Sequence, residues 1–225
     1  MSQRRVRFAT GRLLTGLVCA LTAGLVQAGD VPSPDYATLK ARLAAGDTTV
    51  DFRALRFAHA ASAEYLPNSP DSLVRRKLVQ DALEAGRFAE AATLLEKWLA
   101  ADFLNPFAHL GAVRAYRELG NEDKAKFHDA VVDGLFASIC ARDEGLSEDR
   151  PCPVLSIDEQ HFFLVMNGFT VQGEYGTDCS GQRPCQVYEV RKLNTNEAFT
   201  LYFDISRPLA FRAARHAAGT PAQNE

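Results

Sequence analysis

The chain has 225 residues, of which 47% are hydrophobic and 24% are charged, and its formal net charge at pH 7 is −3. This composition is that of a globular protein, and it excludes a collagen-like chain, a wholly disordered chain and a polytopic membrane protein. The slight acidic excess argues against nucleic-acid binding through bulk positive charge. The length suits one large domain or two small ones.

Residues 1–28 are predicted to be a secretory signal peptide that is cleaved after Ala28. Four arginines and no acid come first, an apolar stretch from Leu13 to Val26 follows, and small residues precede the cleavage site. An uncleaved anchor is the alternative, but this stretch is weaker than a membrane span of about 20 apolar residues. Cleavage would leave 197 residues with a formal charge of −7. We therefore expect an acidic periplasmic or secreted protein that has no stable membrane span and binds no nucleic acid.

The four cysteines that remain after cleavage are expected to form two disulfides. An even number of cysteines in an exported chain is typical of disulfides. The pairing that closes short loops, which we favour, joins Cys140 to Cys152 and Cys179 to Cys185. A four-thiolate zinc site is the alternative, but its ligand pairs are usually separated by about two to four residues. Here eleven and five residues separate them, so we expect no metal.

Residues 29–140 are predicted to be helical. Apolar residues recur with helical spacing from Asp35 to about Gly46 and from Asp51 to about Tyr65. These two segments are expected to be separate helices that precede a repeat-like region.

A spacing of 34 residues joins two glycines, Gly86 and Gly120, and two alanines, Ala91 and Ala125. This is the period of tetratricopeptide repeats, in which glycine permits the turn between helices and alanine lets them approach closely. The region resembles such repeats, although Trp98 stands where they usually have a small residue. The match covers fewer than the roughly three repeats that a stable solenoid needs. Plain antiparallel helices are the alternative.

Residues 141–212 are predicted to be a small region of mixed helix and strand, and 213–225 a flexible tail. The expected elements are a short strand at Val154–Ile157, a helix from Asp158 to Gly168, extended residues at Phe169–Val171, and a β-hairpin with strands Val187–Leu193 and Phe199–Ile205. The predicted fold class is therefore α+β, with tetratricopeptide-like helical hairpins followed by a small part that contains a β-hairpin.

Four segments carry a resemblance to a known family, and they are Asp51–Ala60, Glu64–Pro67, Glu159–Gly168 and Leu201–Ser206. On these residues the chain, from about Asp35 to Arg207, resembles the domain-of-unknown-function 4919 family of exported bacterial proteins. His59 stands where the family pattern has tyrosine. The resemblance implies bacterial export, and it implies no established activity.

The sequence contains no recognised hydrolase, nucleotide-binding or zinc-protease motif, so we expect no catalytic residue and no cofactor. The most suggestive polar residues are Asp51, Arg56, His59 and Tyr65, and we predict that they form a partner-binding surface. The alternative for Asp51 and Arg56 is a structural role, as a helix cap or in an ion pair.

The leading functional hypothesis is an exported interaction or scaffold module that binds an envelope protein or peptide, because stacked helical hairpins offer a concave surface. One alternative is an envelope hydrolase with a nonstandard site between the two parts of the chain. Another is a carrier of a small molecule or lipid, with an aromatic pocket around Phe162, Phe163, Tyr202 and Phe203. The sequence indicates neither the identity of a partner nor an oligomeric state.

Overall fold

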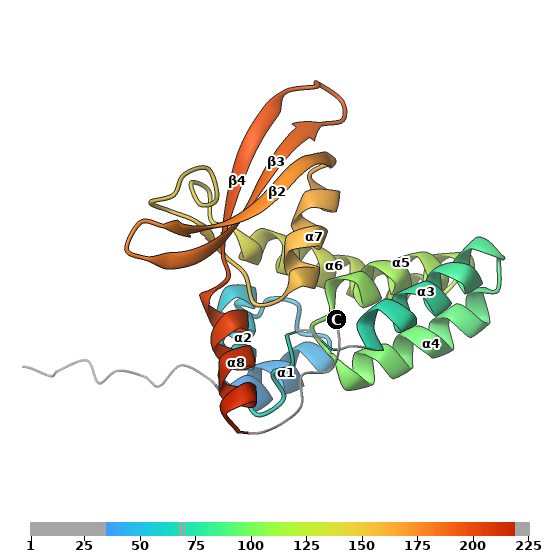
Figure 1. Cartoon of the computed structure of the whole chain (residues 1–225). Coiled ribbons are helices and arrows are strands. Elements are labelled where there is room, and N and C mark those ends of the chain that lie inside the picture. Colours follow the sequence, from blue (N-terminus) through green and yellow to red (C-terminus); the bar gives the residue numbers. More distant parts are fainter. Residues whose placement is uncertain (1–34, 68, 70, 219–225) are drawn as a thin grey trace, which may run out of the picture. The chain divides into compact units, whose positions relative to one another are not determined.

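The computed structural model describes residues 35–67, 69 and 71–218, and the predicted signal peptide lies outside them. Within these ranges the chain forms eight helices and a four-stranded mixed sheet. Figure 1 shows how these elements are arranged. The predicted α+β class is therefore confirmed.

The first two helices, α1 (Tyr36–Ala44) and α2 (Phe52–Ala60), each begin after an aspartate. The carboxylate of Asp35 accepts a hydrogen bond from the Thr38 backbone, and that of Asp51 accepts one from the Ala54 backbone. These bonds satisfy amide groups that the first turn of a helix leaves unpaired. Helix α2 ends at Ala60, earlier than predicted.

Two helical hairpins follow, and they consist of α3 (Asp71–Glu84), α4 (Phe88–Ala101), α5 (Pro106–Glu118) and α6 (Glu122–Ile139). Gly86 and Gly120 lie at the two turns with φ of +69° and +71°, a conformation that costs glycine little. Ala91 and Ala125 are fully buried. Trp98, which departs from the repeat pattern, is also buried and fills the space between these helices. The predicted spacing therefore corresponds to two real hairpins.

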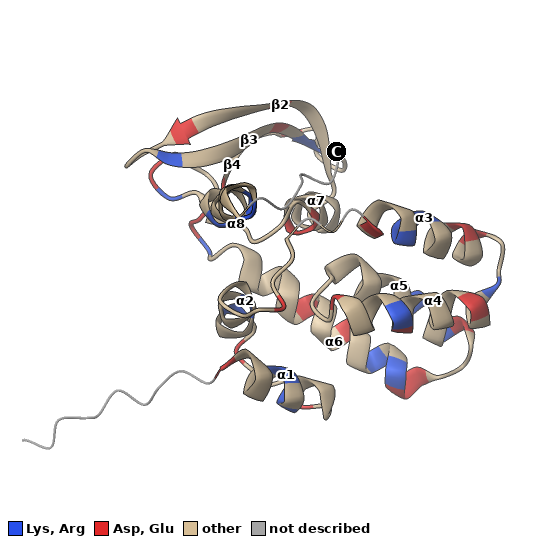
Figure 2. Cartoon of the chain, turned by 60° about the horizontal axis from the view of Figure 1, so that its bottom comes forward, with Lys and Arg blue, Asp and Glu red and all other residues tan. Residues whose placement is uncertain are grey.

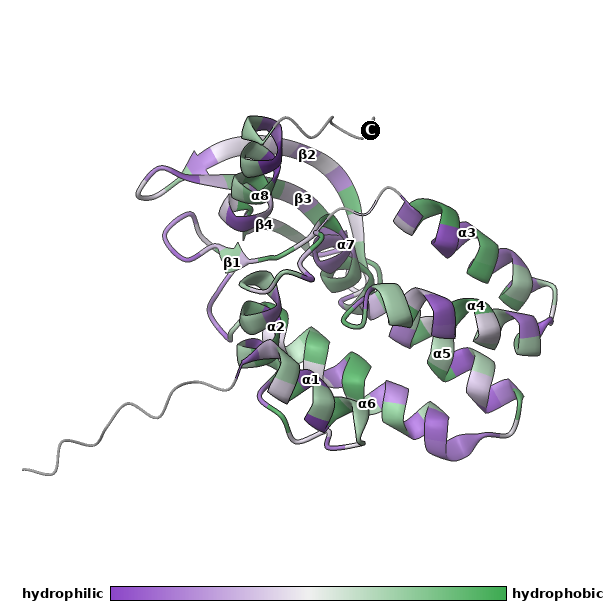
Figure 3. Ribbon diagram, turned by 90° about the horizontal axis from the view of Figure 1, so that it is seen from below, coloured by the Kyte–Doolittle hydropathy of each residue, from purple (hydrophilic) through white to green (hydrophobic). Residues whose placement is uncertain are grey.

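Helix α3 lies at one edge of this helical layer, next to α4 (Figure 3). Two of its apolar side chains are largely exposed, Leu73 at 73% and Val74 at 61%. Lysine and arginine alternate with acids along α3 to α6, so that both signs of charge are interspersed there (Figure 2).

The remaining elements are β1 (Cys152–Pro153), α7 (Ile157–Met166), β2 (Phe169–Cys179), β3 (Arg183–Lys192), β4 (Ala198–Asp204) and α8 (Ser206–Ala217). The strand order is β1-β4-β3-β2, with β1 parallel to β4 and the other pairs antiparallel. Strands β3 and β4 are the predicted hairpin, whereas the predicted strand at Val154–Ile157 is wrong. Val154 and Leu155 instead lead from β1 to Ser156, whose side chain caps α7.

Helix α7 joins the sheet to the helical layer. Phe162 is fully buried in a core that it shares with Val113 of α5, Ile139 of α6 and Phe203 of β4. One face of the sheet is thus covered by α7, and α7 packs in turn on α5 and α6.

The four cysteines form the two predicted pairs. Cys140 is bonded to Cys152, with 5.1 Å between their Cα atoms, and Cys179 is bonded to Cys185, with 5.8 Å. The first disulfide ties the end of α6 to β1, and the second ties β2 to β3. Disulfides are typical of proteins outside the reducing cytoplasm, so these two fit an extracellular or periplasmic protein.

Candidate functional site

Arg56, which the sequence suggested for a partner-binding surface, is only 1% exposed. Its guanidinium donates from Nε to Glu159 Oε1 at 2.7 Å and from Nη2 to Glu159 Oε2 at 2.6 Å. It also donates to the carbonyl oxygens of Ser138 and Pro153, while Glu159 Oε2 accepts from the Leu155 backbone at 2.7 Å. Arg56 therefore binds α2 to the end of α6, to β1 and to α7.

Of the other three residues of that predicted surface, Tyr65 and His59 lie beside the same junction, and Asp51 is exposed. Tyr65 is buried and its hydroxyl donates to the Leu155 carbonyl at 2.7 Å. His59 is half-buried between the rings of Tyr36 and Tyr65, and burial lowers its pKa. Asp51 is the cap of α2. Because Arg56 and Tyr65 are inside the protein, we withdraw them as a surface for a partner and assign them a structural role.

A second polar network lies near this junction, where α3, α5 and α7 meet. Asn105 caps α5, and its Nδ2 donates to Asp102 Oδ2 at 3.0 Å and to Asp158 Oδ2 at 2.9 Å. Arg76 of α3 pairs with Asp158 and lies 3.9 Å above the ring of Phe107. Burial raises the pKa of Asp102. These charged groups are occupied in holding three helices together, so they do not support the hydrolase alternative at this junction.

The aromatic residues predicted to line a carrier pocket form a packed core instead. Phe162 and Phe203 are buried, and Phe163 packs edge-on against Phe203 with 5.8 Å between ring centroids. Tyr202 alternates with Phe203 along β4, so it lies on the opposite face of the sheet. That predicted pocket is therefore wrong.

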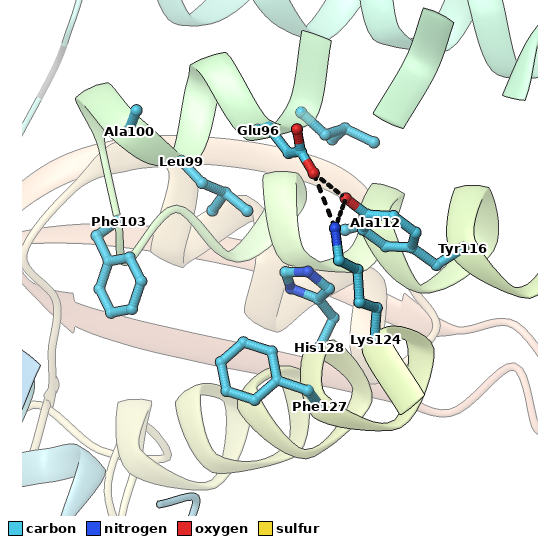
Figure 4. Close-up of a pocket in the computed structure, with 10 residues that line it drawn as sticks. Glu96, Leu99, Ala100, Phe103, Ala112, Tyr116, Lys124, Phe127 and His128 are labelled. Carbon is cyan, nitrogen blue, oxygen red and sulfur yellow. Dashed lines mark hydrogen bonds and ion pairs between the residues drawn. The ribbon is translucent and has the colours of Figure 1, made fainter. Parts of the chain in front are cut away.

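An open cavity of about 350 Å³ lies elsewhere, between the helices of the two hairpins. We call it the α4–α6 groove, and it is lined by Leu95, Glu96, Leu99, Ala100, Phe103, Ala112, Tyr116, Lys124, Phe127 and His128. Figure 4 shows apolar side chains from α4, α6 and the segment after α4 around the hollow, with a polar cluster at one edge.

Glu96, Tyr116 and Lys124 form the polar edge of the groove. Lys124 Nζ donates to Glu96 Oε1 at 3.0 Å and to the Tyr116 hydroxyl at 3.1 Å, and the Tyr116 hydroxyl donates to Glu96. The hydrogen bond from Tyr116, followed by that from Lys124, lowers the pKa of Glu96. The charges at this edge thus neutralise each other.

Two histidines lie beneath this edge. His109 is fully buried and His128 is 9% exposed, and their Nδ1 atoms are 2.8 Å apart. His109 Nε2 is 2.9 Å from the Phe103 carbonyl oxygen, and the ring of Tyr116 stacks on that of His128. Burial lowers the pKa of His109 to about 3 and that of His128 to about 4, so both rings are neutral at pH 7.

The sequence did not identify the groove. Its lining residues come from α4, α5, α6 and the segment after α4, so no short motif contains them. Only the 34-residue spacing indicated that these helices would lie together. Among the described residues, no group of three or more metal-binding side chains occurs. No helix in this part of the chain is long and apolar enough to cross a membrane.

Comparison of the chain with protein-family models, with curated proteins and with solved structures gives no significant match. The resemblance to the domain-of-unknown-function 4919 family and to tetratricopeptide repeats therefore stays a prediction. A function for this chain has to be inferred from the geometry of the α4–α6 groove itself.

Proposed function

We propose that this protein is an exported interaction module whose α4–α6 groove receives an apolar side chain of an envelope protein or peptide. The observation that carries the proposal is the open, largely apolar cavity of about 350 Å³ between two helical hairpins. Sites for whole small ligands occupy about 300–1,000 Å³, so this cavity lies at the small end of that range. Its size favours one large side chain over an entire lipid.

The proposed location is the periplasm or the outside of a bacterial cell, reached through a signal peptide cleaved after Ala28. Two disulfides support a compartment that permits oxidation. The resemblance to the domain-of-unknown-function 4919 family of exported bacterial proteins supports the same location.

Site-specific photo-crosslinking in the native host tests the proposed function. Ala100 and Ala101 are adjacent residues of α4, but only Ala100 lines the groove. We expect a photoreactive side chain at Ala100 to give one reproducible protein adduct that the same group at Ala101 does not give. Phe127→Glu, which places a charge on the groove wall, should abolish the adduct. Equal labelling at both alanines, or an adduct that survives Phe127→Glu, would contradict the proposal.

A further inference from the structure

We propose that the side chain received by the α4–α6 groove is a tryptophan, whose indole N–H donates a hydrogen bond to Nε2 of His128. This inference rests on the proposed function, since it names the chemistry of the partner segment that occupies the groove. It depends on the tautomers of the two histidines and on the charges around them.

The tautomer of His109 is fixed by its contact with the backbone. The Phe103 carbonyl oxygen can only accept, so Nε2 of His109, at 2.9 Å, must donate. His109 is fully buried and neutral at pH 7, and a neutral imidazole carries one N–H. Nδ1 of His109 is therefore an acceptor.

The tautomer of His128 follows from that of His109. Their Nδ1 atoms are 2.8 Å apart, and because the His109 atom accepts, the His128 atom must donate. His128 is neutral as well, so its single proton is on Nδ1. Nε2 of His128 is left as a bare acceptor, which forms no hydrogen bond with the described residues and is not sealed from the cavity.

The surroundings of this acceptor select an uncharged donor. Leu99, Phe103 and Phe127 make the wall beside His128 apolar (Figure 4). Lys124 and Glu96 are paired at 3.0 Å and act on the charge of His128 in opposite senses, so the edge beside this acceptor offers no net charge. A lysine or arginine from a partner would therefore bury its charge against the apolar wall without a free anion to pair with it, which is costly.

Tryptophan matches these requirements better than other side chains do. Its indole is a large apolar ring with one donor and no acceptor. The groove offers one acceptor in an apolar wall, so an indole leaves no polar atom of its own unpaired. Phenylalanine fills the same space but leaves the acceptor of His128 unsatisfied, which weakens binding.

Nitrogen NMR of the disulfide-bonded protein, labelled with ¹⁵N-histidine, tests the acceptor without any ligand. We expect His109 to carry its proton on Nε2 and His128 to carry its proton on Nδ1 at pH 7. A proton on Nε2 of His128 would overturn the inference. That result would leave the crosslinking test of the proposed function unaffected.

Binding of N-acetyl-tryptophanamide tests the donor. We expect it to shift the His128 Nε2 resonance, and we expect methylation of its indole nitrogen to weaken binding by about tenfold, the loss of one buried hydrogen bond. His128→Leu should remove this discrimination, whereas His161→Leu, outside the groove, should retain it. Equal affinity for N-acetyl-tryptophanamide and its indole-methylated form would overturn the inference. An unchanged His128 Nε2 resonance would also overturn it. If the Ala100 adduct still formed, the proposed function would stand in either case.

Discussion

Arg56 shows how a single residue can bind distant parts of this chain together. Its side chain is 1% exposed and makes a bidentate ion pair with Glu159, a residue 103 positions away in the sequence. A buried ion pair is costly to desolvate, and replacement of both charges by apolar residues is often nearly neutral. Removal of only one of the two charges destabilises the protein, because the other charge is left buried without a partner.

We predict that Glu159→Gln lowers the free energy of unfolding by about 3–5 kcal/mol, measured by urea denaturation. Arg53→Met is the matched control. The side chain of Arg53 is 37% exposed and pairs with Glu144 near the surface, so its loss should cost at most about 1 kcal/mol. The double variant Arg56→Met with Glu159→Met should recover most of the lost stability. Equal effects of Glu159→Gln and Arg53→Met would show that burial of the pair contributes nothing.

Some contacts of the candidate site residues are made within one helix, and others join elements that are distant in the sequence. The cap at Asp51 could be predicted, since it depends on residues three positions apart. The partner of Arg56 could not, because no local pattern connects α2 with α7. The same holds for His109 and His128, whose contact depends on how α5 packs against α6. A single sequence therefore showed polar residues of interest without showing which of them are buried.

Elements were predictable where their own residues determine them. The turns at Gly86 and Gly120 need positive φ, and the β3–β4 hairpin has alternating apolar residues. Strand β2 was expected only at Phe169–Val171. Most of it is exposed and polar, and its order comes from pairing with β3 and from a disulfide. Helix α8 extends into the predicted tail, to Ala217, and most of its residues are exposed.

Helices α2 and α6 approach each other closely where Gly134 faces Phe52. Gly134 lies within α6, and a Cβ atom there would collide with the ring of Phe52. Alanine favours helix over glycine by about 1 kcal/mol, but the collision should outweigh this gain. We expect Gly134→Ala to lower the melting temperature and to destabilise the protein by about 1–3 kcal/mol.

A double-mutant cycle with Phe52→Leu separates the collision from other effects. The smaller side chain makes room, so Gly134→Ala should cost less when Phe52→Leu is already present. Additive effects of the two substitutions would mean that the contact with Phe52 is not the cause.

Helix α6 contributes buried residues to all three apolar clusters of the described part of the molecule. Ala125 faces the core of the two hairpins, Val131 and Leu135 face α1 and α2, and Val132 and Ile139 face the core beneath the sheet. Three apolar clusters thus share one helix, and the ion pair of Arg56 with Glu159 closes the junction between them. We therefore expect the helical part and the sheet to unfold in one transition.

The stability of the whole molecule should depend on pH through its buried histidines. His109 and His128 have pKa values of about 3 and about 4 in the folded protein, against 6.5 in an unfolded chain, because burial disfavours their charged forms. Between these limits the unfolded state binds more protons than the folded state. The free energy of unfolding should therefore rise with pH across this window. The stability that depends on the neutral histidines is present above pH 6.5 and is lost progressively as the pH falls below that value.

We predict that the free energy of unfolding falls by about 2–4 kcal/mol from pH 7 to pH 5, measured by urea denaturation at each pH. His59 and His161, whose pKa values are also lowered by burial, add to this loss. Asp102 acts in the opposite sense, because burial raises its pKa and the folded state then gains a proton as pH falls. The double variant His109→Gln with His128→Gln should flatten the profile. If this variant keeps the wild-type dependence on pH, His109 and His128 are not the source of the acid sensitivity.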